Sequence, residues 1–340
     1  MGGAQCVARA PVSCAMRNRY ARRVRPLSPQ FRPYAWALST AEIAGLAGIP
    51  PEQVLRFDGN TPPGPPPTAR PETIAAALGR INSYRHGGFG ELLRAIAGYS
   101  GVEPDQVVLG AGADDLLMLC ARSYAGPGDR IAIAYEPSYP LYRVAAWVAG
   151  ADVGDDHPVL TFVCRPHNPS GAMVDLPEAR PLVVDEAYFE YGGETAVPLL
   201  GDGVIVVRTF SKAFGLASAR VGYALADAET AAELNERQQP APVSTLGAAL
   251  ALAGLEAGPP DVSGTIAERE RLSAGLRSLG LEPLPSFTNF VLVPHERSDE
   301  LYDALLRRGL AVRPSPGAIR ITVHRPDADD RLLGALGALL

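Results

Sequence analysis

Between residues 90 and 226, short continuous apolar runs alternate with segments that have helical spacing. The apolar runs are VVLGAG (107–112), IAIAY (131–135), TFVC (161–164), LVVDEA (182–187), VIVVRTF (204–210) and VGYALA (221–226). Strands buried on both faces are apolar at every position, whereas half-exposed strands alternate apolar and polar residues. The pattern therefore predicts a mainly parallel sheet wrapped by helices.

The last third of the chain has a different pattern. A long helical stretch (about 228–279) is followed by three further strand candidates and a terminal helix. These candidates are NFVLVPH (289–295), LAVRP (310–314) and AIRITVH (318–324). This order favours a smaller α+β domain, so the fold class is α/β with two unequal domains.

The N-terminal part divides into an extension, a helix and a connector. Residues 34–49 have helical spacing, with Ser39 or Thr40 as the N-cap. The run TPPGPPP (61–67) lacks the N–H donors of a helix or a central strand, so we interpret it as a stiff connector rather than a polyproline ligand.

The pattern indicates four regions in the chain. They are an arginine-rich extension (1–35) expected to be disordered, a segment joining the small domain (36–66), a large domain (67–235) and a small C-terminal domain (236–340). The extension has no acidic residue, so an organellar transit peptide or a basic arm is the alternative interpretation.

Composition and charge exclude several classes of function. A net charge of −6 argues against nucleic acid as the partner, and no apolar run approaches the length of a membrane span. The four cysteines and five histidines are scattered without metal-ligand spacing. We expect reduced thiols and a cytoplasmic protein without a metal site.

The sequence contains a single lysine, Lys212, beside thirty arginines. Lys212 follows one predicted strand, Asp185 ends another, and Asn168 and the turn 110–115 follow two more. Ligands of parallel sheets bind at the carboxyl ends of the strands. A desolvated lysine can become a neutral nucleophile, which arginine cannot. An amine, a carboxylate and a glycine-rich turn on one edge therefore favour covalent carbonyl chemistry over an incidental surface cation.

Two of these features have other interpretations. GAGADD (110–115) could belong to a dinucleotide-binding fingerprint, but its third glycine is absent and its acidic residues come too early. Asp185 alone could be a helix N-cap.

The segment TFSKAFGLASARVGY (209–223) resembles the lysine segment of the fold-type-I, pyridoxal-phosphate-dependent aminotransferases (class I/II), especially their histidinol-phosphate aminotransferase branch. The similarity covers residues 54–324. Its other segments are NSYRHGGFGELLRAIAGY, VVLGAGADDLL, YEPSYPLYR, RPHNPSG, VVDEAYFEY, TNFVLV and VRPSPGAIRITV. Together, in this order and spacing, they are a specific signal.

The resemblance implies pyridoxal 5'-phosphate as cofactor, with Lys212, Asp185 and Tyr188 as catalytic residues. Lys212 would hold the cofactor and move the α-proton, and Asp185 would pair with the ring nitrogen. The remaining implied cofactor contacts are Asn168 and Tyr188 at the phenolic oxygen, Tyr139 on the ring face, and Ala113, Asp114, Thr209, Ser211 and Arg220 around the phosphate.

The same resemblance implies the substrate contacts and a dimer. Arg320 would bind the substrate carboxylate, and Arg313, Asn60 and Asn289 are further pocket residues. Tyr84 would reach the phosphate of the neighbouring subunit of a homodimer.

The chain departs from the family pattern at several positions. RHGG follows Tyr84, Ala113 replaces a hydroxyl residue, and the segments 139–168, 168–185 and 313–320 are short. The last of these shapes substrate specificity, so the resemblance defines the cofactor site better than the substrate.

The leading hypothesis is amino transfer from an amino acid, glutamate, to a keto acceptor, with histidinol phosphate/imidazole acetol phosphate as the second pair. Alternatives within the fold are an aromatic or specialised-metabolite aminotransferase and an amino-acid-phosphate decarboxylase. A binding module without turnover and a nicotinamide-dependent dehydrogenase are the alternatives from other classes.

Overall fold

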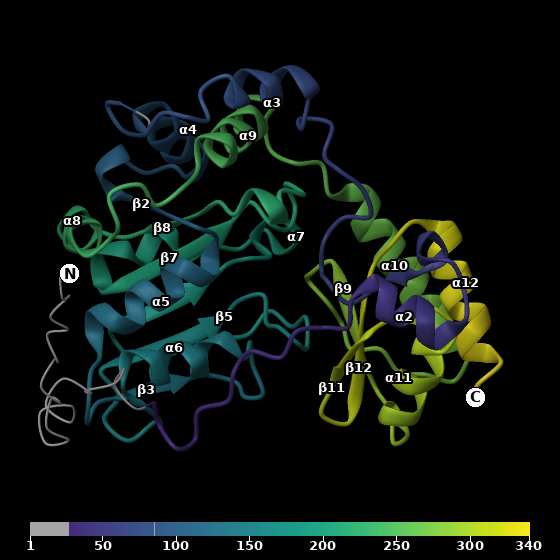
Figure 1. Ribbon diagram of the computed structural model, residues 1–340. Coiled ribbons are helices and arrows are strands. Elements are labelled where there is room, and N and C mark those ends of the chain that lie inside the picture. Colours follow the sequence, from purple (N-terminus) through teal and green to yellow (C-terminus); the bar gives the residue numbers. More distant parts are fainter. Residues whose placement is uncertain (1–26, 85) are drawn as a thin grey trace, which may run out of the picture.

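The computed structural model describes residues 27–84 and 86–340. Its larger part is built on a mixed sheet in the order β2-β8-β7-β6-β5-β3-β4 (Figure 1). The strands are β2 (Val107–Gly110), β3 (Arg130–Ile133), β4 (Asp152–Val153), β5 (Leu160–Cys164), β6 (Leu182–Asp185), β7 (Val204–Thr209) and β8 (Gly222–Leu225). Strands β3 to β7 pair in parallel, whereas β8 is antiparallel to β2 and β7. The mainly parallel sheet predicted from the apolar runs is confirmed.

Helices cover both faces of this sheet. The helices among the described residues are α2 (Thr40–Ala47), α3 (Pro71–Leu78), α4 (Gly90–Ser100), α5 (Ala113–Tyr124), α6 (Leu141–Ala149), α7 (Phe189–Gly192), α8 (Ala228–Glu236), α9 (Thr245–Glu256), α10 (Ser263–Ser278), α11 (Ser298–Leu306) and α12 (Pro326–Gly337). Short 3-10 turns lie at Pro51–Gln53, Pro104–Gln106, Val197–Asp202 and Ala217–Ala219.

Each face of the sheet has its own apolar core. One core joins α5, α6 and α8 to strand residues such as Val207, and the other joins α4 and α9 to residues such as Val206. Consecutive residues of a strand point to opposite faces, so burial of both explains the unbroken apolar runs.

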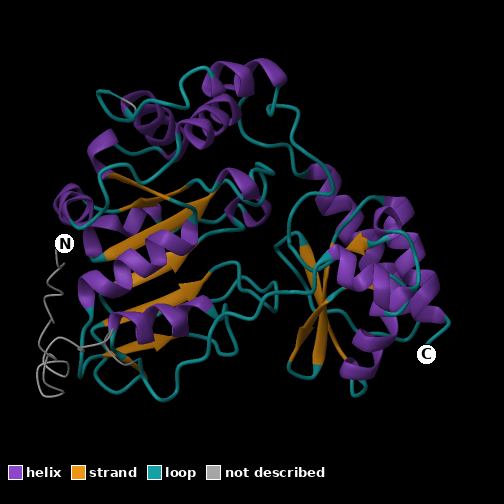
Figure 2. Cartoon of the chain, in the orientation of Figure 1, coloured by secondary structure: helices purple, strands orange, loops and turns teal. Residues whose placement is uncertain are grey.

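The smaller part contains an antiparallel sheet in the order β11-β12-β9, backed by α10, α11 and α12 (Figure 2). Its strands are β9 (Phe290–Pro294), β11 (Arg313–Ser315) and β12 (Ala318–Thr322). Strand β1 (Leu55–Arg56) pairs in parallel with β10 (Leu310–Ala311), so the N-terminal segment contributes to this part.

Two predicted helical stretches differ from the structure. The helix expected over 34–49 begins only at Thr40, because Ser39 and Glu42 form a capping box that fixes its start. The stretch 228–279 is divided into α8, α9 and α10, and prolines occupy both intervening loops.

The predicted domain boundary at residue 235 falls within the last turn of helix α8, so it assigns helix α9 to the small domain. That helix packs against α3 and α4 over the large sheet. We therefore propose that the boundary falls between α9 and α10.

The described part of the N-terminal extension lies against the large part. The Phe31 ring meets Trp147 of α6 edge to face, with centroids 6.0 Å apart. Residues 1–26 of the predicted extension lie outside the described residues. Within 27–84 and 86–340, no helix has the length and apolarity that crossing a membrane requires.

Candidate active site

A cavity of about 540 Å³ lies beyond the carboxyl ends of β5, β6 and β7, where the large and small parts meet. Most of the predicted site residues line it, although they come from distant parts of the chain. They are Asn60, Ala113, Asp114, Tyr139, Asn168, Asp185, Tyr188, Thr209, Ser211, Lys212, Arg220, Arg313 and Arg320. The structure therefore brings these residues together at one edge of the sheet.

One end of the cavity is the N-terminus of α5. Gly112 is the N-cap with a φ of 85°, and no side chain caps the helix. The first backbone N–H groups, which belong to Ala113 and its neighbours, are left for another acceptor. Such a helix start favours an anion such as a phosphate group.

Arg220 and two hydroxyl groups surround this helix start. Arg220 Nη2 donates to the Ala111 carbonyl oxygen at 3.2 Å and to Asp114 Oδ2 at 3.1 Å. Thr209 Oγ1 donates to Ser211 Oγ at 2.9 Å. The guanidinium and the hydroxyls add donors to the backbone N–H groups, so this end of the cavity can hold a dianion.

Asp185 lies at the end of β6 and is only 3% exposed. Tyr142 donates its hydroxyl to Asp185 Oδ2 at 2.7 Å, and the Ala187 N–H donates to Oδ1 at 3.0 Å. Burial raises the pKa of Asp185 to about 6, although both hydrogen bonds act to lower it. At neutral pH Asp185 is therefore a fixed, buried carboxylate suited to a cationic partner.

Lys212 follows β7 and directs its Nζ atom to the Gly59 carbonyl oxygen at 3.3 Å. Burial, together with the positive charge of Arg320, lowers the pKa of Lys212 to about 8. A substantial fraction of this amine is therefore neutral near physiological pH. A neutral amine is the form that attacks an aldehyde.

Polar side chains on the other cavity walls form a hydrogen-bonded network. Asn60 Nδ2 donates to the Tyr188 hydroxyl at 2.9 Å, and Thr322 Oγ1 donates to Asn60 Oδ1 at 2.9 Å. Tyr139 donates its hydroxyl to Asp114 Oδ1 at 3.0 Å. The network fixes the rings of Tyr188 and Tyr139 at the cavity edge.

Arg320 is held at the boundary between the large and small parts. Its Nη1 atom donates to Asn168 Oδ1 at 2.6 Å and its Nη2 atom to the Asp58 carbonyl oxygen at 3.0 Å. Its Nε atom is buried and has no acceptor within residues 27–84 and 86–340. An unpaired donor on a half-buried cation that lines the cavity favours an anionic ligand.

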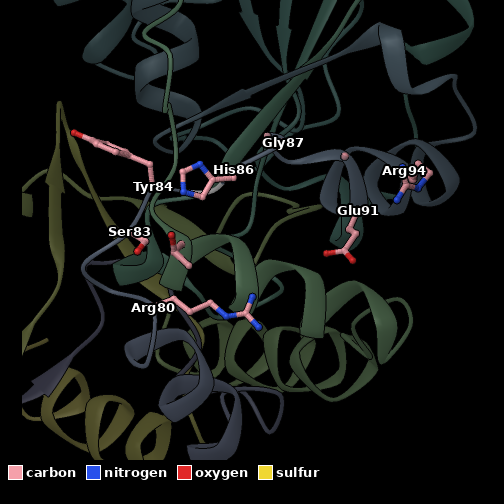
Figure 3. Close-up of a pocket in the computed structure, with 10 residues that line it drawn as sticks. Arg80, Ser83, Tyr84, His86, Gly87, Glu91 and Arg94 are labelled. Atoms are coloured by element: carbon pink, nitrogen blue, oxygen red, sulfur yellow. The ribbon is translucent and has the colours of Figure 1, made fainter.

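Two predicted residues do not line this cavity. Asn289 is 2% exposed and lies behind the wall, where its Nδ2 atom donates to the Asn60 carbonyl oxygen at 3.0 Å. Tyr84 is 84% exposed and lines a separate surface pocket of about 590 Å³. Figure 3 shows its ring extending away from Glu91 and Arg94 in that pocket.

Sequence reasoning missed Tyr142, the hydrogen-bond donor to Asp185. Tyr142 belongs to the segment YEPSYPLYR, three residues after Tyr139. It is fully buried in α6, and a buried tyrosine hydroxyl needs a partner. The sequence does not indicate that this partner is Asp185. Thr322, which is bonded to Asn60, and Arg56 and Asp58, which line the cavity as an ion pair, were also missed.

Comparison with known proteins agrees with this geometry. Residues 151–336 match the aminotransferase class I and II family. The chain is 32% identical to histidinol-phosphate aminotransferase of Caldanaerobacter subterraneus subsp. tengcongensis, over 88% of this chain and 97% of that protein. It is 36% identical to histidinol-phosphate aminotransferase 2 of Methylococcus capsulatus, over 79% and 85%.

A solved structure has the same architecture. Histidinol-phosphate aminotransferase of Sinorhizobium meliloti, in complex with pyridoxal-5'-phosphate, superposes with a TM-score of 0.77 at 26% identity. The alignment covers 92% of this chain and 99% of that one. The chain belongs to the aminotransferase class I and II family. It is a fold-type-I, pyridoxal-phosphate-dependent aminotransferase that acts on small molecules.

The residues present fit this cofactor. The uncapped start of α5 suits the phosphate, the buried carboxylate of Asp185 suits a protonated ring nitrogen, and the partly neutral amine of Lys212 suits the aldehyde. These three groups line one cavity.

Proposed function

We propose that the enzyme transfers an amino group between glutamate and imidazole acetol phosphate, the keto form of histidinol phosphate. The names of the relatives support this substrate pair. The resulting role is a reaction of histidine biosynthesis.

The observation that carries the proposal is a pair of arginines in the cavity. Arg313 on β11 lies directly opposite Arg320 on β12. Residues opposite each other in an antiparallel pair point to the same face, and like charges there repel. A doubly charged phosphate between the two arginines would offset this repulsion. Its oxygens would accept hydrogen bonds from both guanidinium groups. The same pair accommodates the carboxylates of glutamate.

Bound pyridoxal phosphate supplies an aldehyde that links to an amine and a ring that accepts the electron pair of the substrate α-carbon. Lys212 would hold the aldehyde, and its amine would then move the proton between the substrate α-carbon and the cofactor. Its pKa of about 8 allows it to act as base and as acid near neutral pH.

The other residues hold and orient the cofactor. Asp185 would keep a positive charge on the ring nitrogen, because an uncompensated buried carboxylate favours a cationic partner. Asn168 and Tyr188 bind the phenolic oxygen, and Tyr139 covers the ring face. The phosphate is bound by a further set of residues, namely Ala113, Asp114, Thr209, Ser211 and Arg220.

The working protein is a homodimer in this proposal, with Tyr84 completing the site of the neighbouring subunit. Leu78, Ile81 and Tyr84 are all more than half exposed along α3 and the turn that follows it. Exposed apolar side chains that follow one another in this way favour burial against a second copy. A cytoplasmic location is consistent with the free thiols of Cys120 and Cys164.

A two-stage experiment tests the proposed function. Glutamate alone should change the absorbance of the bound cofactor in a single turnover and release 2-oxoglutarate. Imidazole acetol phosphate should then restore the original spectrum and yield histidinol phosphate. Release of carbon dioxide without the spectral change would instead indicate a decarboxylase.

The role of the pair Arg313 and Arg320 in substrate binding can be tested with the same reaction. Arg313→Gln removes one charge while retaining a polar side chain of similar length. We expect the KM for histidinol phosphate to rise by about tenfold or more, because a charge-assisted hydrogen bond contributes about 1.5–3 kcal/mol. An unchanged KM in this variant would contradict phosphate binding by the pair.

A further inference from the structure

An N-terminal strap, residues 31–38, crosses the outer edge of the active-site cavity. Its Tyr34 ring meets Tyr139 edge to face at 6.3 Å, and Arg313 Nη2 donates to the Ala35 carbonyl oxygen at 3.4 Å. Arg56 Nη1 donates to the Leu38 carbonyl oxygen at 2.9 Å. The strap is therefore attached to both parts of the molecule between which the cavity lies, as the purple ribbon of Figure 1 shows.

The strap presents one large side chain without a covering partner. Trp36 is 90% exposed, yet it lines the cavity together with Tyr34 and Ala37. Its only ring contact among the described residues is Tyr34, edge to face with centroids 6.1 Å apart. Burial of a tryptophan ring is strongly favourable, so a bare indole at a cavity edge suits a ligand surface.

The inner and outer walls of the cavity differ in chemistry. The inner wall carries Lys212, Asp185 and Arg320, whereas the outer wall carries Trp36 and the prolines of the turn 314–316. Arg56 also lies there, but its guanidinium is paired with the Asp58 carboxylate at 2.7 Å. The outer wall therefore offers aromatic and apolar surface around Trp36, with Arg313 as the cation beside it.

We propose that Trp36 is a specificity-determining residue that contacts the flat heteroaromatic ring of the substrate while the arginine pair holds its anionic end. The inference rests on the proposed function, because it assigns the imidazole of histidinol phosphate to the indole. A protonated imidazole over an indole face adds a cation–π attraction to ring contact. Glutamate has no ring and gains nothing from Trp36.

Kinetics of Trp36→Ala test the proposal. The KM for histidinol phosphate should rise about tenfold, the effect of an aromatic contact, with little change in kcat. The KM for glutamate should stay at the wild-type value, and Trp36→Phe should recover most of the affinity. An unchanged KM for histidinol phosphate, or an equal rise for both substrates, would overturn the proposal.

Fluorescence gives a readout that does not depend on turnover. The sequence has two tryptophans, and Trp147 is buried in α6. In Trp147→Phe holoenzyme, imidazolylpropyl phosphate, which lacks the reacting amine, should quench the remaining emission. Propyl phosphate, which lacks the ring, should not. In the matched variant Trp36→Phe the imidazole compound should have no effect. Quenching that persists there would place the ring elsewhere and refute the assignment.

The outcomes distinguish a failure of the proposed function from a failure of the inference about Trp36. Wild-type enzyme that does not convert histidinol phosphate would refute the proposed function and the inference together. Active wild-type enzyme with an unaffected Trp36→Ala variant would refute the inference alone. A shift of Trp36→Ala to smaller size in size-exclusion chromatography would assign Trp36 to contact with a second copy, against the proposal.

Discussion

The pKa values of Lys212 and Asp185, which line the same cavity, are shifted in opposite directions. Burial lowers the pKa of the amine to about 8 and raises the pKa of the carboxyl to about 6. In both cases burial disfavours the charged form. A cofactor with a cationic ring nitrogen and an aldehyde relieves both costs, so cofactor binding stabilises the residues that hold it.

Asp185→Asn should make the apoprotein more stable while impairing the enzyme. Asparagine keeps the partners of Asp185, because its oxygen can accept from the Ala187 N–H and its amide can donate to Tyr142. At pH 7 the gain should be about 3 kcal/mol, since a pKa raised from 3.8 to about 6 disfavours the ionised native form.

The gain should depend on pH in a defined direction. The penalty of ionised Asp185 is fully present above pH 6 and is lost as pH falls toward 4, so the two proteins should converge in acid. Urea unfolding of both apoproteins from pH 4.5 to 8 would measure this. An Asp185→Asn variant that is less stable than wild type at every pH would contradict the claim that ionised Asp185 destabilises the apoprotein.

At the scale of elements, the phosphate end of the site depends on close packing of α5 against β8. A Cβ atom on Gly222 would lie 2.6 Å from the Gly112 carbonyl carbon and 2.7 Å from the Ala113 nitrogen. Real Cβ atoms do not approach backbone so closely, so glycine at 222 permits the helix to start where it does.

Gly222→Ala should displace the start of α5 and weaken cofactor binding by tenfold or more, because overpacking costs about 1–3 kcal/mol. Titration of the apoprotein with pyridoxal phosphate would measure the Kd. Gly98→Ala in helix α4 is a matched control, because its added Cβ atom would meet no atom within 4 Å beyond its chain neighbours and the backbone of its own helix. This substitution should leave the stability of the protein unchanged or raise it slightly. Equal cofactor affinity in both variants would argue against this packing.

The elements that sequence predicts best are those governed by local pattern. The run VIVVRTF became β7 because every residue is buried, and Ser39 with Glu42 set the start of α2. The pairing of β1 with β10 joins residues more than 250 positions apart and has no local signature. Such contacts depend on tertiary packing, which periodicity does not record.

The same division applies to the site. Lys212, Asp185 and Asn168 could be predicted because each follows an apolar strand run, and strand ends meet at one edge. Tyr142, Thr322 and Trp36 are placed at the site by contacts between distant segments of the chain. Their positions follow from the packing of the two parts, so their residue types alone could not indicate them.

At the scale of the whole molecule, the exposed Tyr84 and the half-buried Lys212 should belong to different subunits at each active site of the dimer. Tyr84→Ala and Lys212→Arg homodimers should each be nearly inactive. Mixed and reassembled, they should recover about a quarter of wild-type activity, because half of the dimers are hybrids and each hybrid has one intact site.

Light scattering should give the dimer mass for each protein before mixing. No recovery on mixing dimeric variants would mean that Tyr84 acts within its own subunit or not at all. A monomer mass for the active wild-type enzyme would contradict the dimer.

The central claim is that the amine of Lys212 holds the cofactor, and borohydride reduction of the loaded enzyme tests it most directly. The rate of cofactor capture should rise with pH through about 8, as the amine loses its proton, and then level off. Mass spectrometry should find a reduced phosphopyridoxyl group on the peptide that contains Lys212 and none in Lys212→Arg. Loaded, active enzyme without that adduct, or with the adduct on the N-terminal amine alone, would contradict the claim.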